Sequence, residues 1–379
     1  MEPLTHFLTG ACIGRAGFNR KTRYATVVAV LAAEAADIDI LWGFAGPVEE
    51  LKHHRAITHT LVAAPVMAGI VVGVAWLAHR WRNARRMNEQ RGTELAGAVE
   101  GSAGRGSQRV HWGWLYATAV VAALSHLALD WMNNYGLRPF YPFNPRWYAG
   151  SFMFIVEPVL YVLFALALLM PWLLGMADRE MGVRRQPFRG RGWAVFALAA
   201  FAAVGCLRWE EHRQAISMIN VADVTPEPII NIAAEPYPVN PFRWHAIIET
   251  KDYYQTAEVN SWDAGASDAI ATDPQTDILY KPAVTPAVEA AKQTLLGQVY
   301  LDWTHWALVR DVGQQPEPAL KPPVLPPGRT WTTVTFNDLR FDYSFLPGGS
   351  RSRGPLSGWV YIVDGREEAG EGMGDQVQR

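Results

Sequence analysis

The sequence predicts a mainly α fold: a multi-pass transmembrane helix bundle of about five spans with a short N-terminal membrane helix, followed by a C-terminal extracytoplasmic α+β domain. Half of the 379 residues are apolar and only 18% are charged. The long uncharged runs lie in residues 1–215, whereas the remainder is rich in Pro, Asp, Thr and Trp and is typical of a soluble domain. The net charge of −2 gives no reason to expect a nucleic-acid partner.

Hydrophobic runs locate the spans. The hydrocarbon core needs roughly 20 apolar residues per helix. On this criterion the spans lie at residues 24–45, 58–80, 112–133, 152–176 and 193–213. The last run has a short uncharged core, so that helix must be short, tilted inside the bundle, or extended through its polar end at 208–213.

Residues 2–15 are apolar but too few to span a bilayer, and no small-residue cleavage site of a signal peptide follows them. We predict a short membrane helix here. It lies either deep in the bundle, with His6 facing a polar site, or at the interface, with His6 in water.

Lys and Arg are distributed unevenly among the segments between the spans. Loop 81–110 contains six Arg, loop 177–192 contains five, and residues 1–23 are also basic, whereas loops 46–57 and 134–150 contain two basic residues each. The positive-inside rule then places the three richer segments in the cytoplasm and the C-terminal domain outside.

Composition divides the chain into a helical transmembrane domain at 1–220, a linker at 221–236, an α+β domain at 237–365 and a disordered tail at 366–379. Within the α+β domain, alternating apolar residues predict a hairpin and helical apolar spacing predicts a helix. The expected elements are a hairpin at 246–259, a helix at 286–309 and strands at 329–336, 338–345 and 357–364. No catalytic pattern occurs in this domain, so we expect it to cap the outer mouth of the bundle or to select a substrate.

Carboxylates and imidazoles gather at the ends of the predicted spans, and all of these clusters except His6 fall on the predicted extracytoplasmic side. Ionisable residues at membrane depth are costly and mark functional sites. Because only Lys and Arg set the orientation, this convergence independently supports a single site. The clusters are Glu34/Asp37/Asp39, His53/His54/Arg55/His59, Ser125/His126/Asp130, Glu157 and His6.

Helical spacing separates the stronger pairs from the weaker ones. His126 and Asp130 are four residues apart, so on an α-helix they share a face and can hold a common ion; the alternative is a buried hydrogen-bonded pair. Asp37 and Asp39 are two apart and point about 200° from each other on a regular helix. Either one of them serves another purpose or the helix loosens there.

Other candidates have alternative interpretations. Two adjacent histidines rarely bind the same ion, so at least one of His53 and His54 is not a ligand. Glu157 is either a ligand or base, or a carboxylate that favours the positive end of a helix dipole. Arg55 either binds a phosphate or carboxylate oxygen or pairs as an ordinary loop residue.

Several short motifs, in this order and spacing over the first 160 residues, resemble the YdjM-type inner-membrane metal-dependent hydrolases. They are Pro3 to Gly10, Asp37-Ile38-Asp39, His54-Arg55-Ala56-Ile57-Thr58-His59, Ser125 to Asp130, and Arg146 to Gly150 with Glu157-Pro158. The resemblance implies a multi-pass protein of the bacterial inner membrane. The metal ligands that it implies are His6, Asp37, Asp39, His54, His59, His126 and Asp130. Glu157 stands where Asp would be expected as readily.

A ligand set of His and Asp suits Zn²⁺, with Mn²⁺ or Fe²⁺ as alternatives, and seven candidates exceed the four ligands of one tetrahedral centre, so one or two ions are expected. A water activated by the metal would hydrolyse an ester or phosphoester. Because the site lies at headgroup depth, we expect membrane lipids as partners and a lipid-like substrate such as a phospholipid. Arg55 and Glu157 are the candidate catalytic residues.

The competing interpretation is a non-enzymatic membrane protein, stress-responsive or receptor-like, with a structural metal site. An ion pathway is a further alternative, because polar intramembrane residues also mark ion pathways. A pathway would need ionisable residues near both membrane faces. The candidates apart from His6 are confined to one half, which favours a fixed site.

Overall fold

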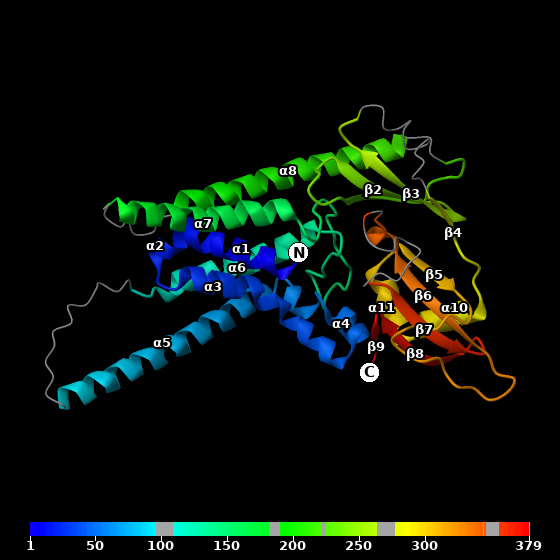
Figure 1. The fold of residues 1–379 in the computed structure, drawn as a ribbon, viewed down its shortest axis with the longest axis horizontal. Coiled ribbons are helices and arrows are strands. Elements are labelled where there is room, and N and C mark those ends of the chain that lie inside the picture. The colour runs from blue at the N-terminus through cyan, green and yellow to red at the C-terminus, as the bar shows by residue number, and fades with distance from the viewer. Residues whose placement is uncertain are drawn as a thin grey trace.

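The computed structural model shows a helical N-terminal part and a C-terminal part built on two β-sheets (Figure 1). It describes residues 1–95, 109–181, 190–221, 225–263, 277–343, 345 and 356–378.

The N-terminal part is helical throughout its regular elements. The α-helices are α1 (Pro3–Ile13), α2 (Asn19–Lys21), α3 (Ala25–Glu34), α4 (Pro47–His53), α5 (Ala63–Leu95), α6 (Trp112–Met132), α7 (Pro158–Glu180) and α8 (Arg191–Val221). A π-helical turn η1 (Gly14–Phe18) follows α1, and two 3₁₀ segments, η2 (Ala35–Ala45) and η3 (Ile57–His59), lie near α4.

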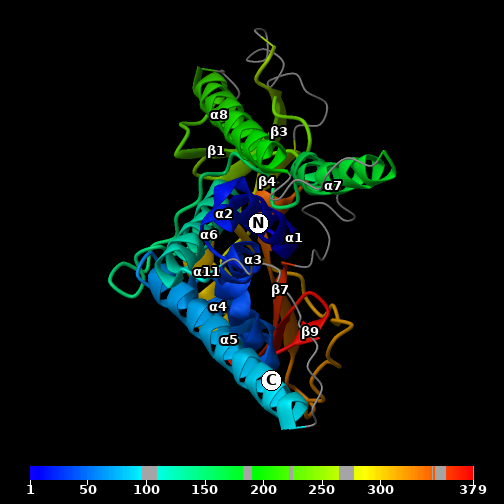
Figure 2. The same ribbon diagram turned by 90° about the vertical axis from the view of Figure 1, so that its left-hand side faces the viewer.

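Helices α1, α3 and α6 pack in the centre of this part, with α5 on one side and α7 and α8 on the other (Figure 2). Small side chains allow the close approach of the central helices. Ala29 and Ala33 of α3 are fully buried. A Cβ on Gly10 of α1 would lie only 2.9 Å from the backbone oxygen of Ala29, so the contact of α1 with α3 requires glycine.

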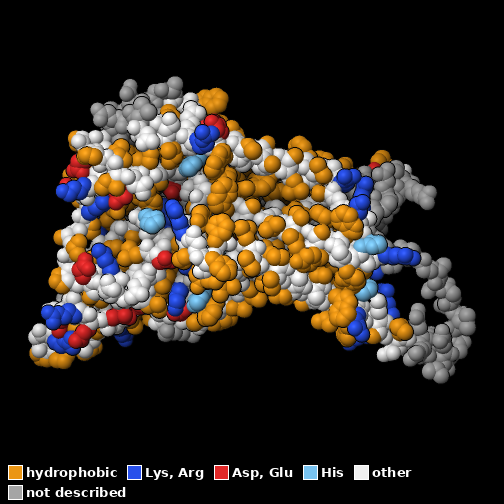
Figure 3. Space-filling model, turned by 180° about the vertical axis from the view of Figure 1, so that it is seen from behind, with side chains coloured by type: hydrophobic (Ala, Val, Ile, Leu, Met, Phe, Trp, Pro, Cys, Tyr) orange, Lys and Arg blue, Asp and Glu red, His pale blue; other side chains and the backbone are white. Residues whose placement is uncertain are grey.

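Within the described residues, four helical segments are long and apolar enough to cross a membrane: Ala63–Asn88, Trp112–Met132, Pro158–Asp178 and Arg191–Asn220. Figure 3 shows hydrophobic side chains over the surface of the helical part, with Lys and Arg at the end far from the sheets. Exposed apolar side chains of this extent are typical of a lipid-facing surface.

The first predicted span, at 24–45, is not a continuous α-helix. Helix α3 ends at Glu34, and the chain continues as the 3₁₀ segment η2 to Ala45. The predicted loosening near Asp37 and Asp39 therefore occurs. Its physical consequence is a change in the directions of the side chains, because a 3₁₀ helix has 3.0 residues per turn in place of 3.6.

The predicted fifth span, at 193–213, continues as α8 through its polar end to Val221. Arg208, although in this polar stretch, is fully buried and pairs with Glu157 at 2.8 Å. The other carboxylate oxygen of Glu157 accepts a hydrogen bond from the backbone N–H of Val239 at 3.0 Å. This neutralised pair explains how a charged helix end packs inside the molecule.

The C-terminal part contains one four-stranded and one five-stranded sheet, both antiparallel and with strands in sequence order. The first sheet comprises β1 (Asn231–Pro236), β2 (Arg243–Glu249), β3 (Tyr253–Asn260) and β4 (Asp277–Tyr280). The second comprises β5 (Ala307–Asp311), β6 (Trp331–Asp338), β7 (Gly358–Val363), β8 (Glu367–Met373) and β9 (Gln376–Val377). Helices α10 (Pro286–Gln293) and α11 (Leu295–Trp303) lie against the second sheet, and a 3₁₀ turn η4 (Leu339–Phe341) follows β6.

Several predicted boundaries differ from the structure. Strand β1 lies inside the predicted linker at 221–236, so the first sheet begins before residue 237. The predicted helix at 286–309 is two helices that end at Trp303, and its last residues begin strand β5. The hydroxyl of Thr294 caps the second helix by accepting from the N–H of Gly297 at 3.2 Å. The predicted strand at 338–345 is replaced by η4 where the chain is described.

The segment predicted as a disordered tail, 366–379, instead forms β8 and β9 over its described residues. Strand β8 pairs with β7. The carboxylate of Glu371 is buried and accepts a hydrogen bond from the N–H of Leu296 at 3.0 Å. The Gly- and Glu-rich composition misled the prediction because β8 pairs with both β7 and β9, and its buried carboxylate is hydrogen-bonded.

The two parts share hydrophobic cores. Val48 and Leu51 of α4 lie in one core with Leu296, Tyr300 and Trp303 of the C-terminal part. Polar contacts reinforce this junction: the carbonyl of Asn134 accepts from the Arg340 guanidinium at 2.8 Å, and the carbonyl of Tyr135 accepts from the Trp303 indole at 3.1 Å. The loop after α6 is therefore held by the C-terminal part.

Glu235 of β1 is buried at this junction, beside the hydroxyl of Ser151 at 3.5 Å. Burial raises the pKa of Glu235 to about 8, against the opposing effect of the Arg340 charge. The carboxyl group is therefore protonated in the folded protein at neutral pH and ionised in the unfolded chain. Because the folded pKa lies above the ordinary 4.5, stability falls as the pH rises from about 4.5 to about 8.

We expect Glu235→Gln, which keeps a neutral side chain of the same size, to raise the free energy of unfolding at pH 8 by about 1–3 kcal/mol. The gain should nearly vanish at pH 4.5. Thermal unfolding of the purified protein at both pH values measures this difference. Glu289→Gln, on the exposed face of α10, is the control, and an equal effect of Glu235→Gln at both pH values would contradict the assignment.

Candidate metal centre

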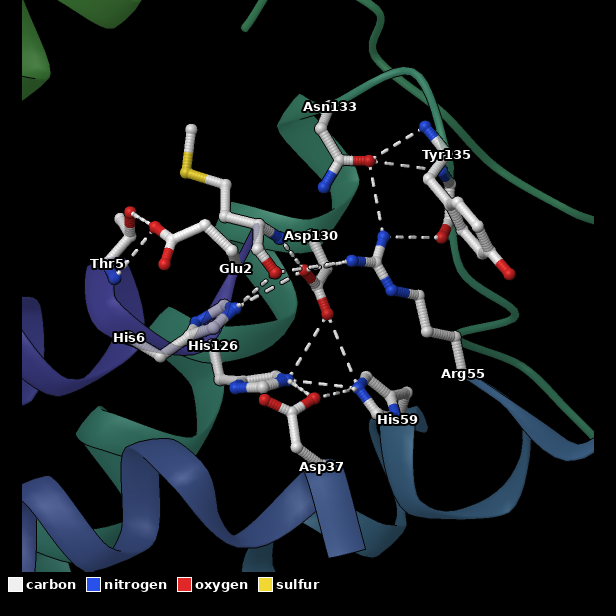
Figure 4. A network of polar contacts seen from close by, with 12 residues as sticks. Glu2, Thr5, His6, Asp37, Arg55, His59, His126, Asp130, Asn133 and Tyr135 are labelled. Atoms are coloured by element: carbon white, nitrogen blue, oxygen red, sulfur yellow. Dashed lines mark hydrogen bonds and ion pairs between the residues drawn. The ribbon is translucent and has the colours of Figure 1, made fainter. Parts of the chain in front are cut away.

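Four side chains from three separated segments meet inside the helical part (Figure 4). One ligand atom from each of Asp37, His59, His126 and Asp130 lies within 4.8 Å of every other. His59, His126 and Asp130 are fully buried, and the side chain of Asp37 is 23% exposed. Two imidazoles and two carboxylates at this separation are a set that could hold a metal ion.

The local structure of each segment explains the convergence. His126 and Asp130 are one turn apart on α6, and the Nε2 of His126 lies 3.2 Å from the Oδ2 of Asp130. His59 ends the short 3₁₀ turn η3 before α5. Asp37 lies in η2, and its Oδ1 is 3.3 Å from the Nε2 of His59 and 3.5 Å from the Nε2 of His126.

Hydrogen bonds on the far side of each ring determine which nitrogen faces the centre. The Nδ1 of His126 lies 2.5 Å from the carbonyl oxygen of Ala33, and a carbonyl only accepts, so Nδ1 bears the proton. The Nδ1 of His59 lies 3.1 Å from the carboxylate of Asp39. With both protons on Nδ1, both Nε2 atoms present lone pairs to the centre, as in histidines that bind metals.

These two Nε2 atoms are only 3.0 Å apart. Two lone pairs and two carboxylate oxygens in a buried space repel one another, and a cation between them removes the repulsion. The Oδ2 atoms of Asp37 and Asp130 also have no hydrogen-bond partner among the described residues. The residues present therefore fit a divalent metal ion.

Asp39 and His54, both predicted as ligands, lie one layer outside this group. The carboxylate of Asp39 accepts from the N–H of Arg55 at 2.8 Å and lies 3.3 Å from the Nδ1 of His54. Asp39 thus orients His59 from behind while Asp37 faces its Nε2. From η2, the two aspartates therefore reach different nitrogens of one imidazole, Asp37 the Nε2 and Asp39 the Nδ1 of His59.

Arg55 is buried and its guanidinium lies 2.9 Å from the Oδ1 of Asp130. It also donates to Asn133 at 3.2 Å and to the carbonyl of Gly136 at 3.0 Å, and it lies 4.7 Å from the centroid of the Tyr135 ring. The Arg55 guanidinium is therefore engaged in contacts within the protein. It holds Asp130 so that the other carboxylate oxygen faces the histidines.

His6 points into the bundle, as one of the two alternatives predicted. Its ring stacks on that of His126 with centroids 3.8 Å apart, and its Nε2 lies 3.4 Å from the Oδ1 of Asp130. The Nδ1 of His6 has no hydrogen-bond partner among the described residues. His6 borders the four-atom group without belonging to it.

The structure does not bring Glu157 to this group. Its carboxylate pairs with Arg208 and accepts from Val239, so it connects α7 to α8 and to the segment before β2. A glutamate just before a helix is the same sequence signal for a metal ligand or base as for a structural carboxylate. His53 likewise lies apart, since it stacks on Trp42 and its Nε2 is 3.2 Å from Glu49.

Sequence reasoning missed some residues that support the centre. The amino group of Met1 forms an ion pair with Asp130, and Asn133, Tyr135 and Gly136 surround Arg55. The Asn133-Asn134 pair directly after the apolar helix α6 was a usable signal, because asparagine at a helix end satisfies exposed backbone and side-chain groups.

The fold and this centre define a membrane protein with a candidate metal site. A family model described as YdjM inner membrane protein matches residues 1–214, more than half of the chain, and the chain belongs to this family. The match covers the helical part, including all the residues of the candidate centre. No curated protein and no solved structure matches the chain.

We expect Asp37→Asn and His59→Ala to lose most of the bound metal that elemental analysis detects in the purified parent protein. His59→Ala removes a facing nitrogen, and Asp37→Asn removes the negative charge of a facing carboxylate. Asp39→Asn should weaken metal binding about 10–100-fold, since it removes only the group that orients His59. A chelator titration separates these two degrees of loss.

The matched control is His53→Ala, which removes an imidazole from the same region but outside the centre. Its metal content should equal that of the parent. If His53→Ala and His59→Ala reduce the metal content equally, the four-residue centre is wrong.

Proposed function

We propose that the protein is a membrane-embedded metal-dependent hydrolase that acts at the extracytoplasmic face on an ester or phosphoester of a lipid-like substrate. The observation that supports it best is the pair of facing Nε2 atoms of His59 and His126, 3.0 Å apart, with oxygens of Asp37 and Asp130 beside them. Membership of an inner-membrane family agrees with the location.

The cation would be held by His59, His126, Asp37 and Asp130, with His6 adjacent to a second position. A bound divalent ion supplies Lewis acidity and lowers the pKa of a water ligand to ~7. The protein itself contributes the tautomers of both histidines, fixed by Ala33 and Asp39. It also excludes water, because three of the four side chains are fully buried.

A cavity at the junction of the two parts provides a place for the substrate. Its volume is about 470 Å³. From the helical part it is lined by Pro47, Glu50, Leu51, His54 and Tyr135, and from the C-terminal part by Leu356, Met373, Gly374, Asp375 and Gln376. His54 connects it to the centre, because the Nδ1 of His54 contacts Asp39 and Asp39 contacts His59. The C-terminal part would then select the substrate.

Arg55 and Glu157 have different roles in this proposal. Arg55 is a positioning residue for Asp130, and its four contacts leave it poorly placed to bind a substrate oxygen. Glu157 is a structural partner of Arg208. Neither is among the residues that line the cavity.

The second candidate function is a non-enzymatic membrane protein with a structural metal. One observation favours it: four protein ligands complete the shell of a tetrahedral Zn²⁺, whereas catalytic zinc sites keep one position for water. Mn²⁺ or Fe²⁺ would retain open positions with the same four ligands. The identity of the native ion therefore distinguishes the two functions.

We expect the parent protein, reconstituted in phospholipid nanodiscs with Mn²⁺, Fe²⁺ or Zn²⁺, to hydrolyse a lipid ester or phosphoester. His126→Ala should lower the rate by about 10³-fold or more while the thermal unfolding transition remains, because the variant lacks the Nε2 atom that would bind the metal. Release of fatty acid or of a headgroup measures turnover. Loss of the folded protein in His126→Ala, with no turnover by the parent, would support the structural metal.

Filling the junction cavity tests the substrate route separately. Gln376→Trp should reduce lipid turnover at least about tenfold at unchanged metal content, since the indole occupies space that the substrate needs. Arg366→Trp, in the exposed turn between β7 and β8, is the matched control. Equal turnover in the parent and Gln376→Trp would exclude this cavity as the route.

A further inference from the structure

A second cavity lies at the opposite end of the helical part, where η1 and α2 turn toward α3. Its volume is about 510 Å³. It is lined by Ala16, Gly17, Phe18, Arg20, Lys21, Trp114 and Arg191. Figure 1 places α2 and the start of α8 at the end of the molecule far from the sheets. This is the end that the distribution of basic residues predicts to be cytoplasmic.

The positive charge of the cavity comes from distant parts of the sequence. Arg20 and Lys21 follow the π-helical turn η1, and Arg191 begins α8. No acidic side chain lines the cavity among the residues that the structure describes. Lys21 and Arg191 thus bring positive charge from distant segments to one lining that contains no described acidic residue, and such a lining favours an anion.

The cavity is shaped by specific contacts. The Nε of Arg191 donates to the carbonyl oxygen of Ala16 at 2.9 Å, which fixes the guanidinium beside the cavity. The ammonium of Lys21 lies 5.4 Å from the centroid of the Trp114 ring. The π-helical turn that bends the chain here is a feature frequent at functional sites.

The chemistry of these groups favours a phosphate. An arginine fork matches the geometry of two phosphate oxygens, and a lysine adds a point charge. Trp114 and Phe18 form the apolar side of the cavity, with ring centroids 6.5 Å apart, and such rings lie at the headgroup level of a bilayer. Basic pockets between membrane helices on the cytoplasmic side bind anionic headgroups.

From these observations we propose that the cavity between η1, α6 and the start of α8 binds a phosphate group, borne by an anionic phospholipid headgroup or by a soluble phosphate. Lys21 and Arg191 bind the phosphate oxygens, and Trp114 and Phe18 contact the part of the ligand nearest the acyl chains. This site is separate from the metal centre, and its presence does not depend on hydrolase activity.

The test uses the full chain in nanodiscs of phosphatidylcholine and phosphatidylglycerol, and native mass spectrometry after release counts the phosphatidylglycerol that each protein retains. Lys21→Gln with Arg191→Gln should reduce retention at least fivefold. Arg82→Gln with Arg85→Gln, two exposed arginines of α5, removes the same charge outside the cavity and should change retention less than twofold. Unchanged metal content verifies that both variants are folded.

A second arm titrates inorganic phosphate into the detergent-purified protein. Phosphate binding that is lost in Lys21→Gln with Arg191→Gln but kept in the control, without preferential retention of phosphatidylglycerol, identifies a soluble ligand. Retention that falls equally in both double variants, or no loss of either ligand in the cavity variant, overturns the proposed site.

Discussion

Two imidazole lone pairs and two carboxylates face one another in a buried space of the helical part. They repel one another unless a cation lies between them, and this constraint governs the surrounding structure. The Nε2 atoms of His59 and His126 could turn away only by breaking the contacts of their Nδ1 atoms with Asp39 and Ala33. Both contacts arise from α3 and the segment directly after it, so the 3₁₀ segment η2 and the end of α3 fix the two tautomers. The fixed nitrogen lone pairs and carboxylate oxygens are therefore complementary to a cation.

Charge balance explains why the surroundings of the centre are also polar. The carboxylate of Asp130 faces the histidines with one oxygen and Arg55 with the other. Arg55 in turn is held by Asn133 and by the ring of Tyr135. Burial raises the pKa of the Tyr135 phenol beyond its ordinary range, so the ring beside the guanidinium stays neutral. Since the carbonyl of Tyr135 accepts from the Trp303 indole of α11, the C-terminal part stabilises the loop that positions the centre.

The sequence indicated which residues gather around the centre better than it indicated which of them face the centre and which only orient the others. Spacing of four residues identified His126 and Asp130 because helical geometry is local. The spacing of Asp37 and Asp39 left two alternatives, a loosened helix or another purpose for one aspartate, and the structure shows both. That Asp39 orients a ligand while Asp37 faces the centre depends on the position of His59, which only tertiary packing sets. Glu157 shows the same limit, because its partner Arg208 lies 51 residues away on α8. In the sheets, strand pairing overrode a composition typical of disorder.

The exposure of the four candidate ligands differs, and this difference bears on whether the metal would be catalytic or structural. Asp37 is 23% exposed while the other three are fully buried, so any exchange of a ligand for water would occur at Asp37. It is also the ligand on η2, a segment with the poorer hydrogen-bond geometry of a 3₁₀ helix. An ion held by His59, His126 and Asp130 alone would leave room for water, as catalytic sites do, whereas binding by Asp37 as well would suit a structural ion. The conformation of η2 therefore bears directly on whether this centre turns over a substrate.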